Sequence, residues 1–122
     1  MESNIKAILI GVYAQEVIEG VHDNTLQNIY ALLVCRTFDV VRIDDVNSFF
    51  VDDEGILKDN LYFEYPSSNG IFQLAGNGLI LGVDDEGNSI SPTLTIEDVK
   101  SKVNFLPEGF KVEPYMKVTA WD

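Results

Sequence analysis

The feature that most constrains the fold is the stretch of residues 75–88, in which a glycine-rich turn leads into a short apolar strand and then into an acidic turn. The glycine turn occupies residues 76–78, the apolar run residues 79–83 and the acidic turn residues 84–88. A short apolar run bounded by turn residues is typical of a buried strand. We therefore expect the earlier part of the chain to form a sheet with this strand, and the later part to cover it.

The rest of the chain predicts further strands. Residues 5–13 are almost continuously apolar and rich in β-branched side chains, which indicates a strand buried on both faces. Residues 16–21 alternate between apolar and polar side chains, as expected for a strand at the edge of a sheet. Further strands are predicted at residues 38–43, 48–51, 61–65, 71–74 and 115–121.

Two segments have helical spacing. Residues 23–25 offer three capping side chains, and the apolar stripe that follows recurs every three or four residues. The stripe consists of Leu26, Ile29, Tyr30, Leu33 and Val34. A second, shorter helix is predicted to begin after Thr95, with Asp98 at its third position, and to end at Asn104. The predicted fold is α+β: a mainly antiparallel sheet of about five to seven strands with two helices packed on it, in one domain over residues 1–122.

The net charge of the chain is −12, from 20 acidic residues and 8 lysines and arginines. Such a surface repels phosphate, so we expect no direct binding to nucleic acid and none to an anionic membrane. It suits a basic protein partner, including one whose basic groove normally holds nucleic acid. A surface charged for solubility is the simpler interpretation. Residues 1–4 lack the basic flank of a signal peptide, and no apolar run is long enough to span a bilayer, so a cytoplasmic location is predicted.

The residues that usually perform chemistry are sparse. His22 is the single histidine and Cys35 the single cysteine, which excludes a zinc site of the usual kind and an internal disulfide. They are predicted at opposite ends of the first helix, so they cannot form a Cys–His nucleophilic pair. The glycines at 76–78 precede a strand, whereas a phosphate-binding loop opens onto a helix. We therefore predict no enzyme activity, no catalytic residues, no cofactor and no metal.

Carboxylates gather at three predicted turns. The pentapeptide of residues 51–55 recurs unchanged at residues 83–87, and a further pair of aspartates ends the strand at 38–43. The candidate partner-binding residues are Asp44, Asp45, Asp52, Asp53, Glu54, Asp84, Asp85 and Glu86. Solvated turns are the simpler explanation. The spacing of a calcium loop is absent, and a shared ion would require the two pentapeptides to meet in space, which the sequence does not decide.

An alternative site for a small ligand combines one basic side chain with aromatic ones. Its candidate residues are Arg42, Tyr62, Tyr65 and Phe72. Aromatic rings can stack on a nucleotide base, and a guanidinium group can pair with its phosphate. Aromatic stripes of this kind more often belong to the core.

The order of several blocks resembles a family of small proteins of bacteriophages, plasmids and other mobile elements, catalogued as a domain of unknown function, family 3846. The blocks are residues 38–43, 50–58, 74–87, 92–99 and 103–105. The resemblance extends from the first predicted strand to Phe105 and leaves residues 107–122 unplaced. It implies a mobile-element origin and a bacterial cytoplasm, and it supplies no activity or site residues.

Charge and resemblance together predict a non-enzymatic accessory protein that acts by binding. The favoured hypothesis is inhibition of a host protein that handles nucleic acid or defends the cell, with carboxylates standing in for phosphates. The alternative is sequestration of a nucleotide-type ligand by the aromatic residues. Homo-oligomerisation, the identity of the partner and the role of residues 107–122 stay open at this point.

Overall fold

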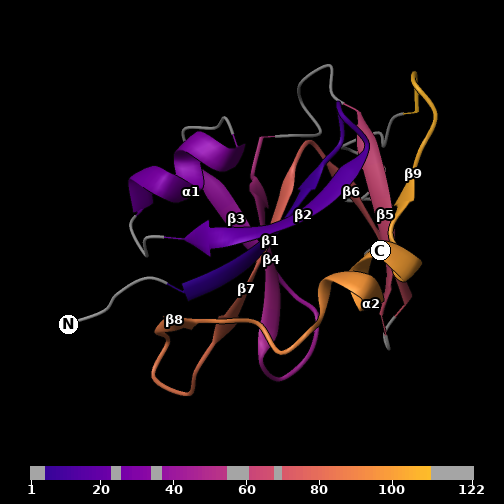
Figure 1. The fold of residues 1–122 in the computed structure, drawn as a ribbon. Coiled ribbons are helices and arrows are strands. Elements are labelled where there is room, and N and C mark those ends of the chain that lie inside the picture. The colour runs from indigo at the N-terminus through magenta and orange to yellow at the C-terminus, as the bar shows by residue number, and fades with distance from the viewer. Residues whose placement is uncertain (1–4, 23–25, 34–36, 55–60, 68–69, 111–122) are drawn as a thin grey trace, which may run out of the picture.

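The computed structural model describes residues 5–22, 26–33, 37–54, 61–67 and 70–110. These residues form two antiparallel sheets and two short helices (Figure 1). The larger sheet contains β1 (Ile5–Gly11), β2 (Glu16–His22), β3 (Phe38–Arg42), β4 (Asn47–Asp52), β7 (Gly78–Val83) and β8 (Ser89–Ile90). The smaller sheet contains β5 (Tyr62–Ser67), β6 (Gly70–Ala75) and β9 (Asn104–Phe105). The helices are α1 (Leu26–Leu33) and α2 (Ile96–Lys102). The α+β class is confirmed, and the strands are divided between two sheets.

Strand β7 occupies the centre of the larger sheet, whose order is β2-β1-β7-β4-β3. Leu79 pairs with Leu9 of β1 on one side and with Phe50 of β4 on the other. Leu79 and its two successors have no exposed surface. At the start of β7, a Cβ on Gly78 would lie 2.7 Å from the ring of Phe63, so the close approach of the two sheets requires glycine here. The organising role predicted for this strand is confirmed.

Both faces of the larger sheet are covered. The face toward the smaller sheet and α2 carries Ile8, Ile10 and Phe49, which pack with Phe63 and Val99. The opposite face lies under α1, where Ile29 and Leu33 of the helix pack with Ala7, Phe50, Leu79 and Leu81 of the sheet. β1 contributes to both clusters, as its continuous apolar run predicts. Figure 1 shows α1 on one side of the larger sheet and α2 beside the smaller sheet. Full burial of each large apolar side chain stabilises the fold by about 1.5–3 kcal/mol.

The two helices follow the predicted patterns closely. In α1, Ile29 and Leu33 are buried, whereas Val34, Cys35 and the capping residues 23–25 lie outside the described residues. In α2, the Thr95 side chain accepts a hydrogen bond from the Asp98 N–H at 3.1 Å, which confirms the predicted cap. The predicted end at Asn104 is wrong. The C-cap is Val103, because Asn104 pairs with Glu64 in β9.

The described strands other than β8 and β9 lie within two residues of their predicted bounds, and those two are additional strands. β5 continues through Pro66 to Ser67, where Pro66 lies opposite Ile71 in the hairpin with β6. The connector before α2 contains the two-residue strand β8, which pairs with the end of β7. The strand predicted at residues 115–121 lies outside the described residues. Neither of the two described helices is long and apolar enough to cross a membrane.

Candidate functional site: the acidic end of the larger sheet

The register of β4 and β7 decides where the three acidic turns lie. The two strands are antiparallel, with Asn47 opposite Gly82 and Val51 opposite Gly78. The turn after β7 therefore lies beside the turn before β4, and the turn after β4 lies at the other end of both strands. We call the first location the acidic end. It comprises Asp44, Asp45, Asp84, Asp85 and Glu86. A separation of about 17–20 Å, the length of a six-residue strand, prevents the two pentapeptides from sharing one ion.

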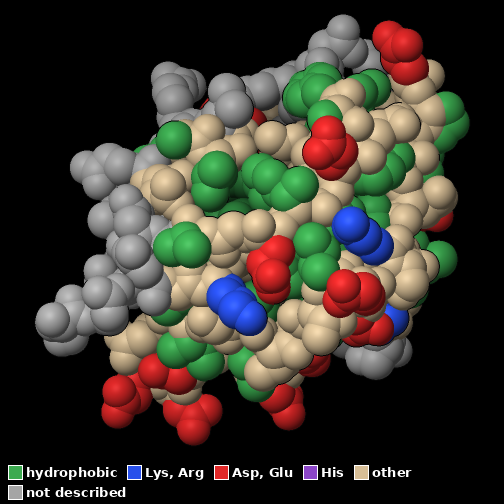
Figure 2. Space-filling view, in the orientation of Figure 1, with side chains coloured by type: hydrophobic (Ala, Val, Ile, Leu, Met, Phe, Trp, Pro, Cys, Tyr) green, Lys and Arg blue, Asp and Glu red, His purple; other side chains and the backbone are tan. Residues whose placement is uncertain are grey.

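Figure 2 shows acidic side chains along the lower edge of the molecule. In Figure 1 the turn between β3 and β4 and the turn between β7 and β8 lie at this edge. The two turns are joined by a backbone hydrogen bond from the Val83 N–H to the Val46 carbonyl, at 2.7 Å. Carboxylates from two distant segments of the chain thus form one negatively charged surface.

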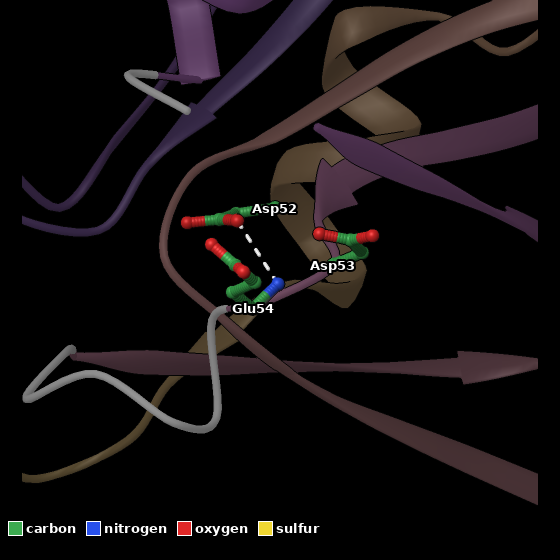
Figure 3. A group of neighbouring side chains, drawn as sticks. All are labelled: Asp52, Asp53 and Glu54. Carbon is green, nitrogen blue, oxygen red and sulfur yellow. Dashed lines mark hydrogen bonds between the residues drawn. The ribbon is translucent and has the colours of Figure 1, made fainter. Parts of the chain in front are cut away.

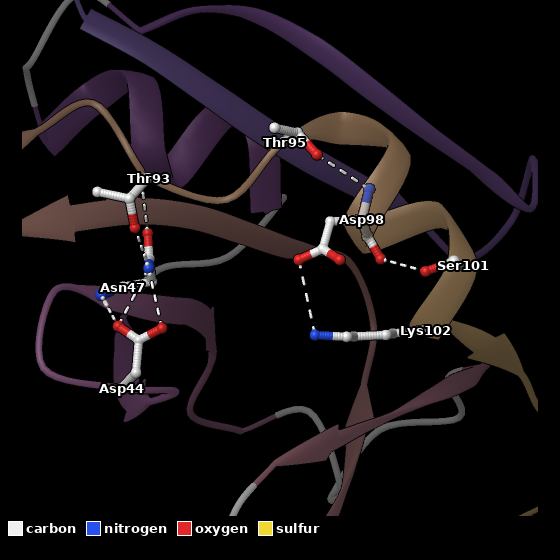
Figure 4. Close-up of polar contacts among 7 residues, drawn as sticks. All are labelled: Asp44, Asn47, Thr93, Thr95, Asp98, Ser101 and Lys102. Carbon is white, nitrogen blue, oxygen red and sulfur yellow. Dashed lines mark hydrogen bonds and ion pairs between the residues drawn. The ribbon is translucent and has the colours of Figure 1, made fainter.

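The turn between β3 and β4 is held by one carboxylate and one buried amide (Figure 4). Asp44 Oδ1 accepts hydrogen bonds from the backbone N–H groups of Val46 and Asn47, each at 2.8 Å. The Asn47 side chain donates to both Asp44 oxygens at 3.0 Å and to Thr93 Oγ1 at 2.8 Å. It also accepts from the Thr93 N–H at 2.9 Å. The fully buried Asn47 therefore anchors this turn to the segment that precedes α2.

These contacts keep Asp44 ionised. Burial by itself would raise the pKa of Asp44, but the hydrogen bonds from Asn47 and Val46 and the charge of Arg42 outweigh it and lower the pKa below its usual value. Arg42 also donates through Nε to the Asp44 carbonyl at 3.2 Å and through Nη2 to the Asp45 carbonyl at 3.4 Å. The guanidinium group thus supports the backbone of the turn, which leaves the Asp45 side chain exposed.

The turn between β7 and β8 uses the same device. Asp84 Oδ1 accepts from the N–H of Glu86 at 2.9 Å and from that of Asn88 at 2.8 Å. The hydrogen bond from the Asn88 backbone, followed by those from Glu86, the Asn88 side chain and Gly87, lowers the pKa of Asp84 against a smaller opposing effect of burial. Gly87 has a φ of 86°, which suits glycine in this tight turn. Asp85 and Glu86 are held out into solvent at its tip.

A pocket of about 350 Å³ opens between the two turns. Its carboxylates are Asp45, Asp84 and Asp85, and its apolar wall is formed by three valines from β3, the adjacent turn and β7. Those valines are Val40, Val46 and Val83. Arg42 and Ser48 complete the lining, so one cation of the protein itself lies among the three carboxylates. The carboxylates outnumber it, and negative groups around an apolar wall suit a side chain with an aliphatic stem and a cationic head, such as lysine or arginine. Asn47 and the valine wall were not predicted as site residues. The spacing of Asp44 and Asn47, which is typical of an Asp-capped turn, was the available signal.

The third acidic turn has a different environment. The nearest carboxylate oxygens of Asp52, Asp53 and Glu54 lie within 4.8 Å of one another (Figure 3). Asp52 Oδ1 accepts from the Glu54 N–H at 3.0 Å, and Asp53 accepts a hydrogen bond from the Thr37 hydroxyl. Asp52 and Asp53 also line, with Asp39, a pocket of about 120 Å³. Among the described residues, the proximity of the carboxylates is the one observation that fits an ion.

The residues of the alternative ligand site lie on opposite faces of the larger sheet. Arg42 is opposite Ser48, on the face that carries Phe50 and α1. Tyr65 is buried between the sheets with its ring 5.1 Å from that of Phe49, and Phe72 packs against the same cluster. Tyr62 is also buried, with its ring 5.3 Å from that of Phe110. The sheet therefore separates the guanidinium group from the rings.

The hydroxyl of Tyr65 is buried and has no hydrogen-bond partner among the described residues. Burial, with the charges of Asp98 and Asp44 as further causes, raises the pKa of Tyr65 to about 12. The phenol therefore stays neutral and belongs to the core. Asp98 itself forms a surface ion pair with Lys102 at 3.6 Å.

The fold and the acidic end define a small α+β protein with two antiparallel sheets and a negatively charged loop surface. Residues 5–104 match the family described as "Domain of unknown function (DUF3846)", and the chain belongs to this family, as the sequence blocks predicted. The chain is also 34% identical over 78 residues to "Uncharacterized protein y4iR" of Sinorhizobium fredii (strain NBRC 101917 / NGR234). That match covers 60% of this chain and 45% of the relative. No solved structure is significantly similar.

Proposed function

We propose that this protein acts by binding, without catalysis, and that its acidic end docks on a basic surface of another protein. The observation that carries the proposal is the meeting of two acidic turns around one pocket lined by Asp45, Asp84 and Asp85. The partner is a host protein that handles nucleic acid or defends the cell, and carboxylates occupy the positions of phosphates. The setting that we propose is the bacterial cytoplasm, with the gene carried by a mobile element.

The rigidity of the two turns supports this proposal. Asp44 and Asp84 each fix their own turn by accepting backbone N–H groups, so the neighbouring carboxylates are presented on an ordered scaffold. A surface ordered before binding loses less conformational entropy when the partner docks. The net charge of −12 adds a long-range attraction that speeds the encounter with a basic partner and weakens as salt is added.

The two copies of the pentapeptide supply a matched pair of variants. Asp85 and Asp53 are both exposed and occupy the same position in each copy, but only Asp85 lines the pocket at the acidic end. Tagged protein would be used to capture partners from bacterial lysate at low and raised salt, with identification by mass spectrometry. Affinity for the captured protein would then be measured for Asp85→Lys and Asp53→Lys.

The expected result is a basic protein that elutes at raised salt and binds the Asp85→Lys variant at least about tenfold more weakly, or ~1.4 kcal/mol. The Asp53→Lys variant keeps the affinity of the unmodified protein. Equal binding by all three proteins, or a loss confined to Asp53→Lys, would show that the acidic end is not the binding surface.

A further inference from the structure

The floor of the pocket at the acidic end contains a buried serine. Ser48 pairs with Arg42 of β3 on one side and with Leu81 of β7 on the other, so its side chain stands on the sheet face that the pocket covers. Ser48 is only 6% exposed, and among the described residues no hydrogen bond engages its hydroxyl. A buried hydroxyl normally has a partner, because leaving it without one costs free energy. Ser48 therefore offers an acceptor and a donor to a group that enters the pocket.

Two carboxylates of the same pocket are also available to a ligand. Asp45 and Asp85 line the pocket from its two turns, and within the described part of the chain neither side chain forms a hydrogen bond or an ion pair. Arg42 donates to the carbonyls of Asp44 and Asp45, and its guanidinium group makes no ion pair with a described carboxylate. The pocket thus combines uncompensated negative charge with a buried hydroxyl.

We propose that this pocket receives one arginine side chain of the basic partner. The inference rests on the proposed docking of the acidic end and names the group that enters it. The aliphatic stem of the arginine lies against the valine wall, and the guanidinium group lies between the carboxylates of Asp45 and Asp85. The Ser48 hydroxyl accepts one hydrogen bond from the guanidinium group. The docked surfaces are thereby joined through one inserted side chain, as well as through charges spread over a flat contact.

The distribution of the acceptors favours arginine over lysine. Asp45 belongs to the turn before β4, Asp85 to the turn after β7, and Ser48 to β4 itself, so the acceptors approach from three sides. A guanidinium group carries five donors in one plane and can bond in several directions at once, whereas an ammonium group is a compact point charge. The guanidinium group is also the more weakly hydrated of the two, so it loses less when it enters a pocket with an apolar wall.

Three capped tripeptides test the pocket in the full chain without the partner. The probes are acetyl-Gly-Arg-Gly-amide and the same peptide with lysine or citrulline in the centre; citrulline keeps the shape of arginine and lacks its charge. Binding is followed by NMR through the methyl signals of Val40, Val46 and Val83, which line the pocket. The arginine peptide should shift these signals in a saturable way and bind at least about fivefold more tightly than the lysine peptide. The citrulline peptide should produce no saturable shift.

Two lysine substitutions test the location with the same change in net charge. Val40→Lys places a cation of the protein in the pocket, whereas Ile71→Lys places one on β6, and both positions are exposed, by 46% and 64%. Val40→Lys should bind the arginine peptide at least about tenfold more weakly, because the new ammonium group competes for the same carboxylates. Ile71→Lys should keep the affinity of the unmodified protein. Equal weakening in both variants would overturn the inference, because general charge would then explain the binding.

Ser48→Ala separates a role in binding from a role in folding. The substitution removes a hydroxyl that has no hydrogen bond among the described residues, so the urea midpoint should stay the same or rise. Affinity for the arginine peptide should fall at least about threefold, because one acceptor is lost. A lower urea midpoint with unchanged peptide affinity would assign the hydroxyl to the fold and overturn its role in the pocket.

Affinity for the captured partner distinguishes this inference from the proposed function. Val40→Lys should weaken partner binding at least about tenfold, as Asp85→Lys does. Weakening by Asp85→Lys alone, or equal shifts from the arginine and citrulline peptides, would overturn the inserted arginine and leave the docking of the acidic end intact. Unchanged partner affinity in both variants would overturn the proposed function together with this inference.

Discussion

The two copies of the sequence Val-Asp-Asp-Glu-Gly share one local hydrogen bond but lie in different surroundings. In each copy the first aspartate accepts a hydrogen bond from the N–H of the glutamate two residues later, at 3.0 Å for Asp52 and 2.9 Å for Asp84. The first copy then meets Thr37, whose hydroxyl bonds to Asp53. The second meets the turn that follows β3 and borders a pocket with it. The first copy also borders a smaller pocket, of about 120 Å³, together with Asp39. Identical residues thus have different neighbours, and the copy that meets a second acidic turn forms the candidate binding surface.

The comparison shows which level of structure makes a site. A turn of this kind is specified by a few adjacent residues, because an aspartate can bond to the backbone two residues ahead in any chain. Its neighbours are specified by strand pairing. Antiparallel pairing of β4 and β7 sends one copy to each end of the sheet. Among the described residues, a further acidic turn lies beside the second copy alone.

The largest effect is expected from removing the amide that anchors the acidic end. Asn47→Ala deletes the hydrogen bonds to Asp44 and Thr93 from a fully buried position, so the free energy of unfolding should fall by about 2–3 kcal/mol. Binding to the captured partner should weaken as well. Asn88→Ala, in the exposed turn after β7, should lower the free energy of unfolding by about 0.5 kcal/mol or less. Urea unfolding measures both, and equal losses would contradict the anchoring role.

A smaller effect is expected from removing one side-chain hydrogen bond at either end of β4. Thr37→Val removes the hydroxyl that donates to Asp53, and Thr93→Val removes the one that accepts from Asn47. Each variant should lose about 0.5–1.5 kcal/mol of stability, the usual contribution of one hydrogen bond. Only Thr93→Val should weaken partner binding, because only its turn belongs to the acidic end. Titration calorimetry with the captured partner distinguishes the two variants. Weaker partner binding by Thr37→Val would contradict the assignment of binding to the acidic end.

The smallest effect is a dependence of stability on pH. The pKa values of Asp44 and Asp84 are lowered in the folded protein, so each carboxylate stabilises the fold above its unfolded pKa of about 3.9. That stabilisation is lost as the pH falls through the lower, folded values. Asp44→Asn and Asp84→Asn should therefore each flatten the decline of the unfolding midpoint below about pH 4. If the unfolding midpoints of the variants fall with pH in parallel with that of the unmodified protein, these two carboxylates do not contribute to the pH dependence of stability.

Much of the fold follows from the sequence because its periodicities are strong. The continuous apolar run of β1 predicts burial on both faces, and Thr95 with Asp98 predicts the start of α2. The sequence predicts the end of α2 at Asn104, but pairing with Glu64 places that residue in β9. A long-range contact therefore overrode a local preference. The division into two sheets likewise depends on contacts that periodicity does not report.

The sequence by itself determined the elements, the capped turns and the strong negative charge, because these depend on adjacent residues and on composition. Only the tertiary structure decided which carboxylates are neighbours. It brings Asp45 next to Asp85, moves Asp53 to the other end, and places Arg42 and Tyr65 on opposite faces of the sheet. The physical reason is strand register, in which the pairing of β4 with β7 converts positions far apart in the chain into positions side by side.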